Sequence, residues 1–270
     1  MADQSAAFVG SIPENYDRYL GPLFFHAYAD DLAARVPLTP GVRVLETACG
    51  TGILTERLLA RLAGEGTIVA TDLNEAMFAQ ARRRGVDGPG LEWRQADATQ
   101  LPFDEASFDV VVCQFGLMFF PDKAAGIREA FRVLKPGGRY LFNVWDALEH
   151  TAVARITHET IASFFPDDPP QFYRVPFSLP DPAPVCAWLE AAGFKEIEWH
   201  ELAKVGTSPS AAEAARGLIE GNPVLGEIMG RRPESLASIK DAVARNLARQ
   251  LGDHPLRGAL SAKVFGARRA

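Results

Sequence analysis

The sequence has little cysteine, no excess of basic residues and no long apolar run. Its three cysteines, Cys49, Cys113 and Cys186, lie far apart and form no C-x-x-C pair, which argues against a disulfide framework and against a zinc site. Lysine and arginine number 28 against 34 acidic residues, so the net charge is -6. The chain therefore lacks the overall positive charge that holds nucleic acid or an anionic bilayer. We expect a small-molecule partner, no metal and no nucleic acid.

Membrane insertion and export are also disfavoured. The longest uncharged apolar run, residues 110–120, is interrupted by Gln114 and Gly116, and it is shorter than the ~20 residues of a spanning helix. The N-terminus, MADQSAAFVGS, lacks the basic start and the apolar stretch of a secretory signal. We therefore expect a cytoplasmic protein without a membrane span.

Residues 42–145 alternate short apolar or β-branched runs with segments of helical spacing. This alternation is typical of βαβ units that form a parallel sheet covered by helices. The segment KPGG at 135–138 predicts the end of a helix and a strand that starts near Gly138, because Pro136 cannot continue a helix. The five runs expected to be strands are VRVLETA, TIVATD, LEWRQAD, FDVVVCQ and RYLFNVW.

Changes of pattern along the 270 residues predict one α/β domain with helical additions. The aromatic residues of one addition favour either an apolar acceptor site or a patch of core. The six predicted parts are an N-terminal helical cap at 1–36, a core at 37–146, an aromatic and proline-rich lid insertion at 147–177, a continuation of the core at 178–206, a helical insertion at 207–254 and a final core strand at 255–270.

The strongest functional signal is VLETACGTG at 44–52, where a strand ends in Gly50-Thr51-Gly52 and a helix begins at once. Glycines let a ligand approach the backbone closely, and the first turn of a helix presents unpaired N–H groups. Asp72 ends the second predicted strand 20 residues after Gly52, the spacing at which a carboxylate accepts hydrogen bonds from ribose hydroxyls. Asp97 ends the third. These residues predict a nucleotide-like ligand.

The loop is poorly suited to a dinucleotide. The fingerprint G-x-G-x-x-G would place a third glycine at position 55, but the residue there is Thr55. The carboxylate of Glu46, just before the turn, is unfavourable beside a pyrophosphate. S-adenosylmethionine fits this pattern better, because it combines a ribose and an adenine with an ammonium and a sulfonium and has no phosphate.

The sequence resembles the class I S-adenosylmethionine-dependent methyltransferases, in the small-molecule branch that includes the ubiquinone and menaquinone biosynthesis enzymes with a type 11 methyltransferase domain. The resemblance covers roughly residues 40–146. It rests on four ordered segments: VLETACGTG, VATDLNEAMFAQAR, QADATQLPFDEASFDVVVCQFGLMFF and REAFRVLKPGGRYLF. It implies an α/β fold with a Rossmann-like, seven-stranded, mostly parallel sheet of order 3-2-1-4-5-7-6, whose last strand is antiparallel and whose faces are covered by helices.

The sequence departs from this family in two places. Ala48 stands where many members have glycine, and its methyl group leaves slightly less room in the loop. The helical insertion at 207–254 is the other departure. Because of this insertion, the acceptor is not carried over from the quinone enzymes.

The resemblance implies two groups of binding residues. The first would surround the methionine and ribose part of S-adenosylmethionine, with Gln114 beside the methionine or the sulfonium. Its members are Glu46, Ala48, Gly50, Gly52 and Gln114.

The second group would hold the adenosine. Asp72 would accept hydrogen bonds from the two ribose hydroxyls, and Leu73 and Met77 would pack against the adenine. Asp97 would accept a hydrogen bond from the exocyclic amine, and the N–H of Ala98 would meet a ring nitrogen. The alternative is that the two acids are helix N-caps and Met77 is core.

Tyr16 and Tyr19 are three residues apart and would share one face of an α-helix. Related enzymes close the cofactor site with a segment of this kind. We hypothesise that both tyrosines cover the methionine end. The alternative is that the pair packs on the sheet.

The resemblance implies methyl transfer to a small organic acceptor by in-line displacement, a reaction that depends mainly on alignment. Aligned reactants gain up to ~7–11 kcal/mol over a bimolecular reference. A phenol, enol or carbon acid would benefit from a base, whereas an amine or thiol needs little help. Among the histidines, His150 lies just beyond the fifth predicted strand and is our candidate base. The alternatives are that His150 is an ordinary exposed residue and that the enzyme uses no base.

Several questions stay open at this point. The methylated atom is oxygen, nitrogen or carbon, the acceptor is apolar or aromatic if residues 147–177 line its site, and the protein is a monomer or a homodimer. One rival function is a nicotinamide (NAD) oxidoreductase with a degenerate fingerprint, and another is a catalytically silent S-adenosylmethionine-binding protein. A nucleic-acid methyltransferase is disfavoured, because Cys113-Gln114-Phe115-Gly116 lacks the acidic or asparagine-proline-aromatic signature of base-amino methylases.

Overall fold

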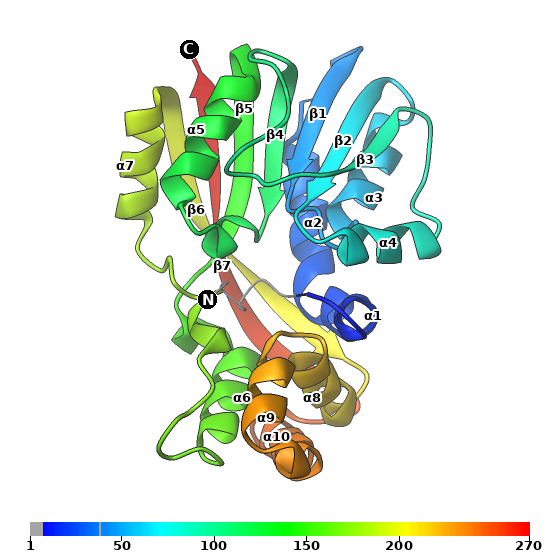
Figure 1. Ribbon diagram of the computed structural model, residues 1–270, viewed down its shortest axis with the longest axis vertical. Coiled ribbons are helices and arrows are strands. Elements are labelled where there is room, and N and C mark those ends of the chain that lie inside the picture. Colours follow the sequence, from blue (N-terminus) through cyan, green and yellow to red (C-terminus); the bar gives the residue numbers. More distant parts are fainter. Residues whose placement is uncertain (1–7, 38) are drawn as a thin grey trace.

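Seven strands form one sheet in the computed structural model, which describes residues 8–37 and 39–270 (Figure 1). The strand order is β3-β2-β1-β4-β5-β7-β6. Strands β1 to β5 pair in parallel, whereas β7 is antiparallel to both β5 and β6. The predicted fold class, strand order and antiparallel last strand are therefore confirmed. The strands are β1 Val42–Thr47, β2 Gly66–Asp72, β3 Leu91–Gln95, β4 Phe108–Gln114, β5 Leu134–Trp145, β6 Phe194–Ser208 and β7 Leu256–Arg269.

The central strands are rich in β-branched residues because both of their faces are covered. Val44 of β1 is fully buried, and so are Val111 and Val112 of β4. On one face lie α2 (His26–Arg35) and α3 (Ile53–Leu62), and on the other lie α5 (Lys123–Val133) and α7 (Pro182–Ala192) (Figure 1). Helix α4 (Glu75–Arg83) follows β2.

Strand β5 begins earlier than the pattern predicts. Helix α5 ends at Val133, and β5 starts at Leu134 and not near Gly138. The reason is that Leu134 already pairs with Phe108 of β4, before a shift of register brings Arg139 opposite Val110. The expected start at Gly138 was wrong because a strand can include an irregular KPGG stretch when its first residue is paired.

A second group of helices lies beyond one end of the sheet. Strands β6 and β7, yellow and red in Figure 1, run on past the other strands to reach it. The helices are α6 (Ala152–Ala162), α8 (Ala211–Glu220), α9 (Val224–Arg231) and α10 (Leu236–Leu251). Helix α10 packs against both α6 and α8, so the segments 147–177 and 207–254 meet in one helical group, which we call the lid after its predicted role. Within residues 8–37 and 39–270, no helix has both the length and the apolar character needed to cross a bilayer.

The N-terminal segment is one long helix with a wide middle. It begins as α1 (Ile12–Asn15), continues as the π-helix η2 (Tyr16–Phe25) and ends as α2. The hydrogen bond from the His26 N–H to the Gly21 carbonyl spans five residues, as in a π-helix. Because the turn is wider than in an α-helix, residues three apart do not share a face here. Residues 1–7 of the predicted cap at 1–36 lie outside the described residues.

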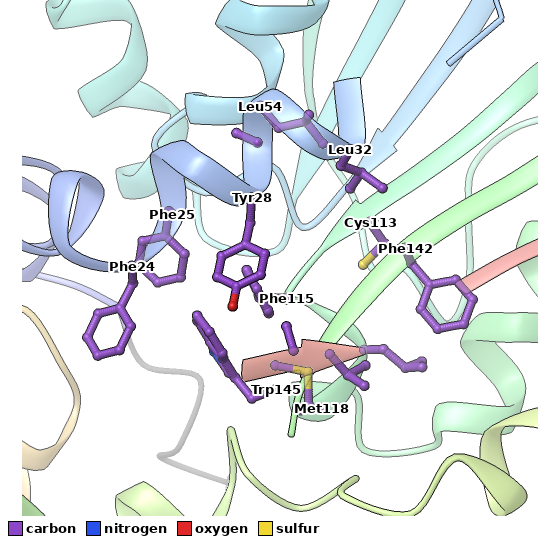
Figure 2. Close-up of a cluster of buried hydrophobic side chains, with 14 of the residues drawn as sticks. Phe24, Phe25, Tyr28, Leu32, Leu54, Cys113, Phe115, Met118, Phe142 and Trp145 are labelled. Carbon is purple, nitrogen blue, oxygen red and sulfur yellow. The ribbon is translucent and has the colours of Figure 1, made fainter. Parts of the chain in front are cut away.

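Aromatic side chains join this N-terminal helix to the sheet. Figure 2 shows Phe24, Phe25 and Tyr28 of the helix beside Phe115 and Trp145. The rings of Phe115 and Trp145 are stacked, with centroids 3.9 Å apart and planes 7° apart. The Tyr28 ring meets both of these rings edge-on, at 5.2 and 5.4 Å. The N-terminal helix is thereby held over the ends of β4 and β5.

Candidate active site

The ends of β1, β2, β3 and β4 surround a cavity of about 830 Å³ that is open to solvent. We call it the strand-edge cavity. It lies at the carboxyl edge of the parallel strands, where open α/β sheets bind their ligands. Its walls are formed by Phe8, Tyr16, Ala48, Gly50, Asp72, Leu73, Asn74, Met77, Ala96, Asp97, Ala98, Gln114, Phe115, Gly116, Phe119, Phe120 and Pro121.

Two smaller cavities share walls with it. The loop cavity, of about 300 Å³, lies behind the glycine loop at residues 50–52 and is lined by Tyr16, Phe25, Glu46, Ala48, Cys49, Gly50, Thr51, Ile53, Leu54 and Gln114. The aromatic cavity, of about 490 Å³, is lined by Phe8, Tyr16, Leu20, Phe24, Phe25, Phe115, Phe119, Trp145, Ala154, Phe172, Tyr173, Pro176, Phe177 and Asn222. Tyr16 contributes to the walls of all three.

Glu46 is a buried carboxyl group at the end of β1. Its side chain is 1% exposed, and its Oε2 accepts a hydrogen bond of 2.7 Å from the Thr55 hydroxyl. Burial raises the pKa of Glu46 to about 8, against the lowering effect of Thr55, with a further increase from Asp72. Thr55 thus occupies the position of the third glycine of a dinucleotide fingerprint and holds Glu46 instead.

Asp72 ends β2 and is held by backbone amides. Its two carboxylate oxygens accept hydrogen bonds from the Gly50 N–H at 2.9 Å and the Asn74 N–H at 2.8 Å. Burial raises the pKa of Asp72 above its ordinary value, although these hydrogen bonds counteract the increase. A carboxylate offers about four acceptor positions, so it can accept further donors from the cavity side.

The backbone is strained at two cavity residues that are not glycine, one after β1 and one after β4. Ala48 has a φ of 52° and Phe115 has a φ of 53°, in the left-handed region that disfavours side chains with a Cβ. Gly50 has a φ of 56°, and a Cβ there would lie 3.6 Å from the Met77 methyl group. Strained residues of this kind collect at functional sites, and Ala48, Gly50 and Phe115 all line the strand-edge cavity.

The remaining predicted adenosine residues lie together on the walls of the strand-edge cavity. Met77 is 4% exposed, whereas Leu73 is 55% exposed at the cavity mouth. Asp97 accepts hydrogen bonds from both the N–H and the hydroxyl of Thr99, at 2.8 and 2.7 Å. Ala98 follows it on the same wall.

Gln114 ends β4 with one half of its side chain unpaired. Its Nε2 donates to the Phe25 carbonyl at 3.0 Å. Its Oε1 is buried and, among the described residues, has no hydrogen-bond partner. Because Gln114 lines both the strand-edge and the loop cavity, it is suited to receive a donor from a ligand.

Three predicted site residues lie away from the cavity walls. Gly52 faces α4 and β3, because a Cβ there would be 2.8 Å from both Ala81 and Trp93. Tyr19 packs beneath α8, where a Cβ on Gly217 would lie 2.5 Å from the Tyr19 Cβ. The π-helical turn separates Tyr19 from Tyr16, so the expectation of a shared face was wrong.

His150, the third of these residues, belongs to a charged cluster behind Trp145. Its side chain is 60% exposed, and its Nδ1 lies 2.7 Å from Oδ2 of the buried Asp146. Asp146 also accepts hydrogen bonds from Lys263 and Ser261. Burial alone would raise the pKa of Asp146, but these hydrogen bonds outweigh it and hold the pKa below its ordinary value. This cluster joins the end of β5 to the middle of β7.

Sequence reasoning missed most of the aromatic cavity. The sequence patterns assigned no binding role to Phe115, Phe119 and Trp145, which lay within predicted strands or family motifs. Asn222 was not predicted as a site residue either. Their side chains meet because distant segments converge. The aromatic composition of 147–177 was the available signal, and of its five aromatic residues Phe172, Tyr173 and Phe177 line the cavity, whereas Phe164 and Phe165 pack in the core.

We predict that Glu46→Gln changes how stability depends on pH. The folded protein keeps a proton on Glu46 up to a pKa of about 8, above the ordinary 4.5. The stability that this proton supports is complete below pH 4.5 and is lost as pH rises through 8. The melting temperature of the variant, measured without ligand from pH 5 to 9, should increase relative to that of the wild type as pH rises. Each kcal/mol of stability corresponds to a shift of about 2–4 °C in the melting temperature. Parallel curves would contradict this.

We also predict that Ala48→Gly stabilises the protein. Relief of left-handed strain contributes about 1–2 kcal/mol, and the added freedom of glycine in the unfolded chain offsets about 0.4–1 kcal/mol of it. Urea unfolding should show a net gain of about 0.5–1 kcal/mol. The control is Ala60→Gly in the exposed interior of α3, which should lose about 1 kcal/mol. Equal losses of stability in both variants would show that the backbone at Ala48 is not strained.

Comparisons with known proteins point to one family. The profile of a family described as a methyltransferase domain matches residues 44–138. A ubiquinone/menaquinone biosynthesis C-methyltransferase of Idiomarina loihiensis is 33% identical over 181 residues, which are 60% of this chain and 70% of the relative. A 2-phytyl-1,4-naphtoquinone methyltransferase of Thermosynechococcus vestitus is 30% identical over 204 residues, which are 69% of this chain and 88% of the relative.

A solved structure agrees in fold. The phosphoethanolamine N-methyltransferase 2 of Haemonchus contortus, solved with S-adenosyl-L-methionine, matches with a TM-score of 0.63 at 16% identity and covers 98% of this chain and 60% of that chain. The nicotinamide oxidoreductase alternative gains no support from these proteins. With the strand order, the glycine loop and the acids at the strand ends, they establish that this chain belongs to the class I S-adenosylmethionine-dependent methyltransferases, a family of enzymes.

Proposed function

We propose that this enzyme transfers the methyl group to a ring carbon of a small, uncharged aromatic acceptor. The cofactor would occupy the strand-edge and loop cavities, and the acceptor would occupy the aromatic cavity. The observation that carries the proposal is the wall that these cavities share, formed by Phe8, Tyr16, Phe115 and Phe119. A molecule in the aromatic cavity would therefore lie next to the cofactor.

The residues at the adenosine end fit the cofactor. Asp72 presents a buried carboxylate at the cavity wall, and ribose hydroxyls are suitable donors for it. Met77 and Leu73 offer apolar surface for a ring, and Asp97 offers a carboxylate to an exocyclic amine. These are the roles that the resemblance to the family implies for these residues.

The residues at the methionine end also fit. Gly50 leaves bare backbone between the loop cavity and the strand-edge cavity. Glu46 and the unpaired Oε1 of Gln114 are acceptors for an ammonium group, and both line the loop cavity. A cation beside Glu46 would favour its ionised form and so lower its pKa. Tyr16, whose pKa burial and nearby acids raise, keeps its hydroxyl proton as a donor.

The walls of the aromatic cavity favour a flat, uncharged acceptor. They consist mostly of phenyl rings, the Trp145 indole and aliphatic groups, and a charge buried among such groups is costly. Asn222 and Tyr173 supply the polar exception. The Asn222 side chain and the Tyr173 hydroxyl both donate to the Leu218 carbonyl, at 3.1 and 2.6 Å. This spot can orient one polar group of the acceptor.

The relatives support a ring carbon as the methylated atom. One of them is named as a C-methyltransferase of ubiquinone and menaquinone biosynthesis, and another acts on a naphthoquinone by its name. Asn222 belongs to the insertion at 207–254, so the part of the acceptor that it touches differs from theirs. We therefore propose an aromatic ring as the acceptor class and no particular quinone.

The chemistry that follows is mainly alignment. The ring carbon gains the methyl group and loses its proton, which passes to the solvent that reaches the open strand-edge cavity. S-adenosylmethionine supplies an activated methyl group when bound. The stacked rings of Phe115 and Trp145, backed by the N-terminal helix, exclude water and hold the acceptor plane. Correct placement is worth up to ~7–11 kcal/mol relative to free reactants. His150 lies off the cavity walls and is paired with Asp146, so we leave it out of the reacting groups.

We predict that Asp72→Asn weakens S-adenosylhomocysteine binding by at least about tenfold, because hydrogen bonds to a charged group contribute ~1.5–3 kcal/mol each. Isothermal titration calorimetry measures the affinity. The matched control is Asp87→Asn, an exposed acid whose carboxylate accepts a hydrogen bond from the Gly88 N–H, and it should bind like the wild type. Equal affinity of Asp72→Asn and Asp87→Asn would reject the cofactor site.

The acceptor proposal is tested by a screen for S-adenosylhomocysteine release. Hydroquinones, naphthohydroquinones, phenols, amines and carboxylic acids are offered with an isotope-labelled methyl donor. We expect turnover with uncharged rings and a new carbon–carbon bond in the product, as NMR would show. Turnover confined to charged amines would overturn the proposal. Binding of S-adenosylmethionine without turnover of any compound would favour the catalytically silent alternative.

Once an acceptor is identified, Phe172→Leu should raise the KM for that acceptor by about two- to tenfold. The reason is that a pair of aromatic rings contributes ~0.5–1.5 kcal/mol beyond the burial of its surface area. The affinity for S-adenosylhomocysteine should stay unchanged. The control is Phe165→Leu, a residue of the same segment that is equally buried but lies outside the walls of the aromatic cavity. Identical KM values for the two variants would remove the aromatic cavity as the acceptor site.

A further inference from the structure

We propose that Arg84 is a positioning residue that fastens the N-terminal helix to the glycine loop and so keeps Tyr16 on the cavity walls. This inference rests on the proposed function, because it assigns Arg84 a part in retaining the cofactor. Arg84 belongs to none of the cofactor-binding motifs, and its side chain lines none of the three cavities.

Arg84 contacts three separate elements from the end of α4. Its Nη1 donates to Asp17 of η2 at 2.6 Å and to the Thr51 carbonyl of the glycine loop at 3.2 Å. Its Nη2 donates to Glu56 in the first turn of α3 at 2.6 Å. One planar guanidinium therefore ties the cap, the loop and the core together, as its fixed fork of donors allows.

The contact with Asp17 is the sheltered one. The side chains of Arg84 and Asp17 are 24% and 12% exposed, whereas that of Glu56 is 46% exposed. Ion pairs that are shielded from solvent are screened less by salt and couple their partners more strongly than exposed ones. The ion pair between Arg84 and Asp17 is therefore the contact of this network that contributes most to holding the N-terminal helix.

The position of Asp17 links this ion pair to the active site. Asp17 directly follows Tyr16, whose ring stacks on Phe25 at 4.8 Å and lines all three cavities. Thr51, on the other side of the guanidinium, lies between Gly50 and Gly52, both of positive φ. When Arg84 releases Asp17, the η2 turn that carries Tyr16 loses the only ion pair that joins it to another element among the described residues.

Neighbouring charges extend the network without replacing Arg84. Arg57 donates to Glu56 at 2.8 Å and to Asp30 of α2 at 3.2 Å. His26 is half-buried, and its burial, with the nearby Arg57 and Arg84, lowers its pKa. These groups tie α2 to α3, whereas among the described residues Arg84 alone forms an ion pair from the core to Asp17.

The test compares Arg84→Met with Arg83→Met in the full-length protein. Arg83 is exposed at the end of α4 and donates to Gln80 of the same helix. The substitution Arg83→Met therefore removes a charge of the same sign at the neighbouring position. We expect Arg84→Met to weaken S-adenosylhomocysteine binding by at least about tenfold and Arg83→Met to leave it unchanged. With a working acceptor, KM for the cofactor should rise more than kcat falls.

Hydrogen exchange of the ligand-free protein separates positioning from general destabilisation. Amides of residues 16–25 should exchange at least about tenfold faster in Arg84→Met, while those of β1 and of residues 53–62 keep their rates. Asp17→Asn should reproduce both effects, and the double variant should be no worse than either single one. Glu56→Gln should leave residues 16–25 protected, because Glu56 lies on α3 and its ion pair with Arg84 does not involve η2.

The outcomes are distinct. If the wild type binds no S-adenosylhomocysteine, the proposed function fails. If it binds and Arg84→Met matches Arg83→Met in affinity and exchange, the role of Arg84 is overturned. Faster exchange throughout the chain in Arg84→Met would also overturn it, because that pattern marks a loss of overall stability.

Discussion

Five parallel strands end at the same edge of the sheet, and the arrangement of this active site depends on that constraint. Parallel pairing places the residues after β1, β2, β3 and β4 side by side, although they are separated by helices in the chain. A carboxylate at each of two strand ends, Asp72 and Asp97, and an amide at a third, Gln114, thereby face one cavity. No single loop could collect these groups.

The second requirement is a wall on the open side of that edge. The core supplies only Phe115, Phe119 and Trp145 for it, and the rest comes from outside the core. The N-terminal helix brings Tyr16 and Phe25, and the lid brings Phe172, Tyr173 and Asn222. Strands β6 and β7 extend past the other strands to the lid (Figure 1), and residues of the lid line the aromatic cavity.

The site also concentrates unfavourable features that the rest of the fold must offset. Ala48 and Phe115 have left-handed backbones, Glu46 is buried with a raised pKa, and the Gln114 oxygen lacks a partner. Each costs stability, of order 1–3 kcal/mol for strain or an unpaired group. Their gathering around one set of cavities is expected where a ligand restores the missing partners, and the fully buried valines of β1 and β4 offset the cost.

The sequence by itself determined the sheet, the glycine loop and the acids at the strand ends, because these depend on short-range patterns: alternation, helix spacing and turn residues within about 30 positions. The start of β5 and the face shared by Tyr16 and Tyr19 were misjudged, since pairing with Phe108 and a π-helical turn override local spacing. Only the tertiary structure decided that His150 turns to Asp146, that Arg84 reaches Asp17, and that rings from four segments of the chain line one cavity. The contact of Arg84 with Asp17 and the meeting of the rings join residues far apart in the chain, and the packing that brings such residues together leaves no periodic signal in the sequence. His150 and Asp146 are only four residues apart, but Lys263 and Ser261, which hold Asp146, come from a distant strand.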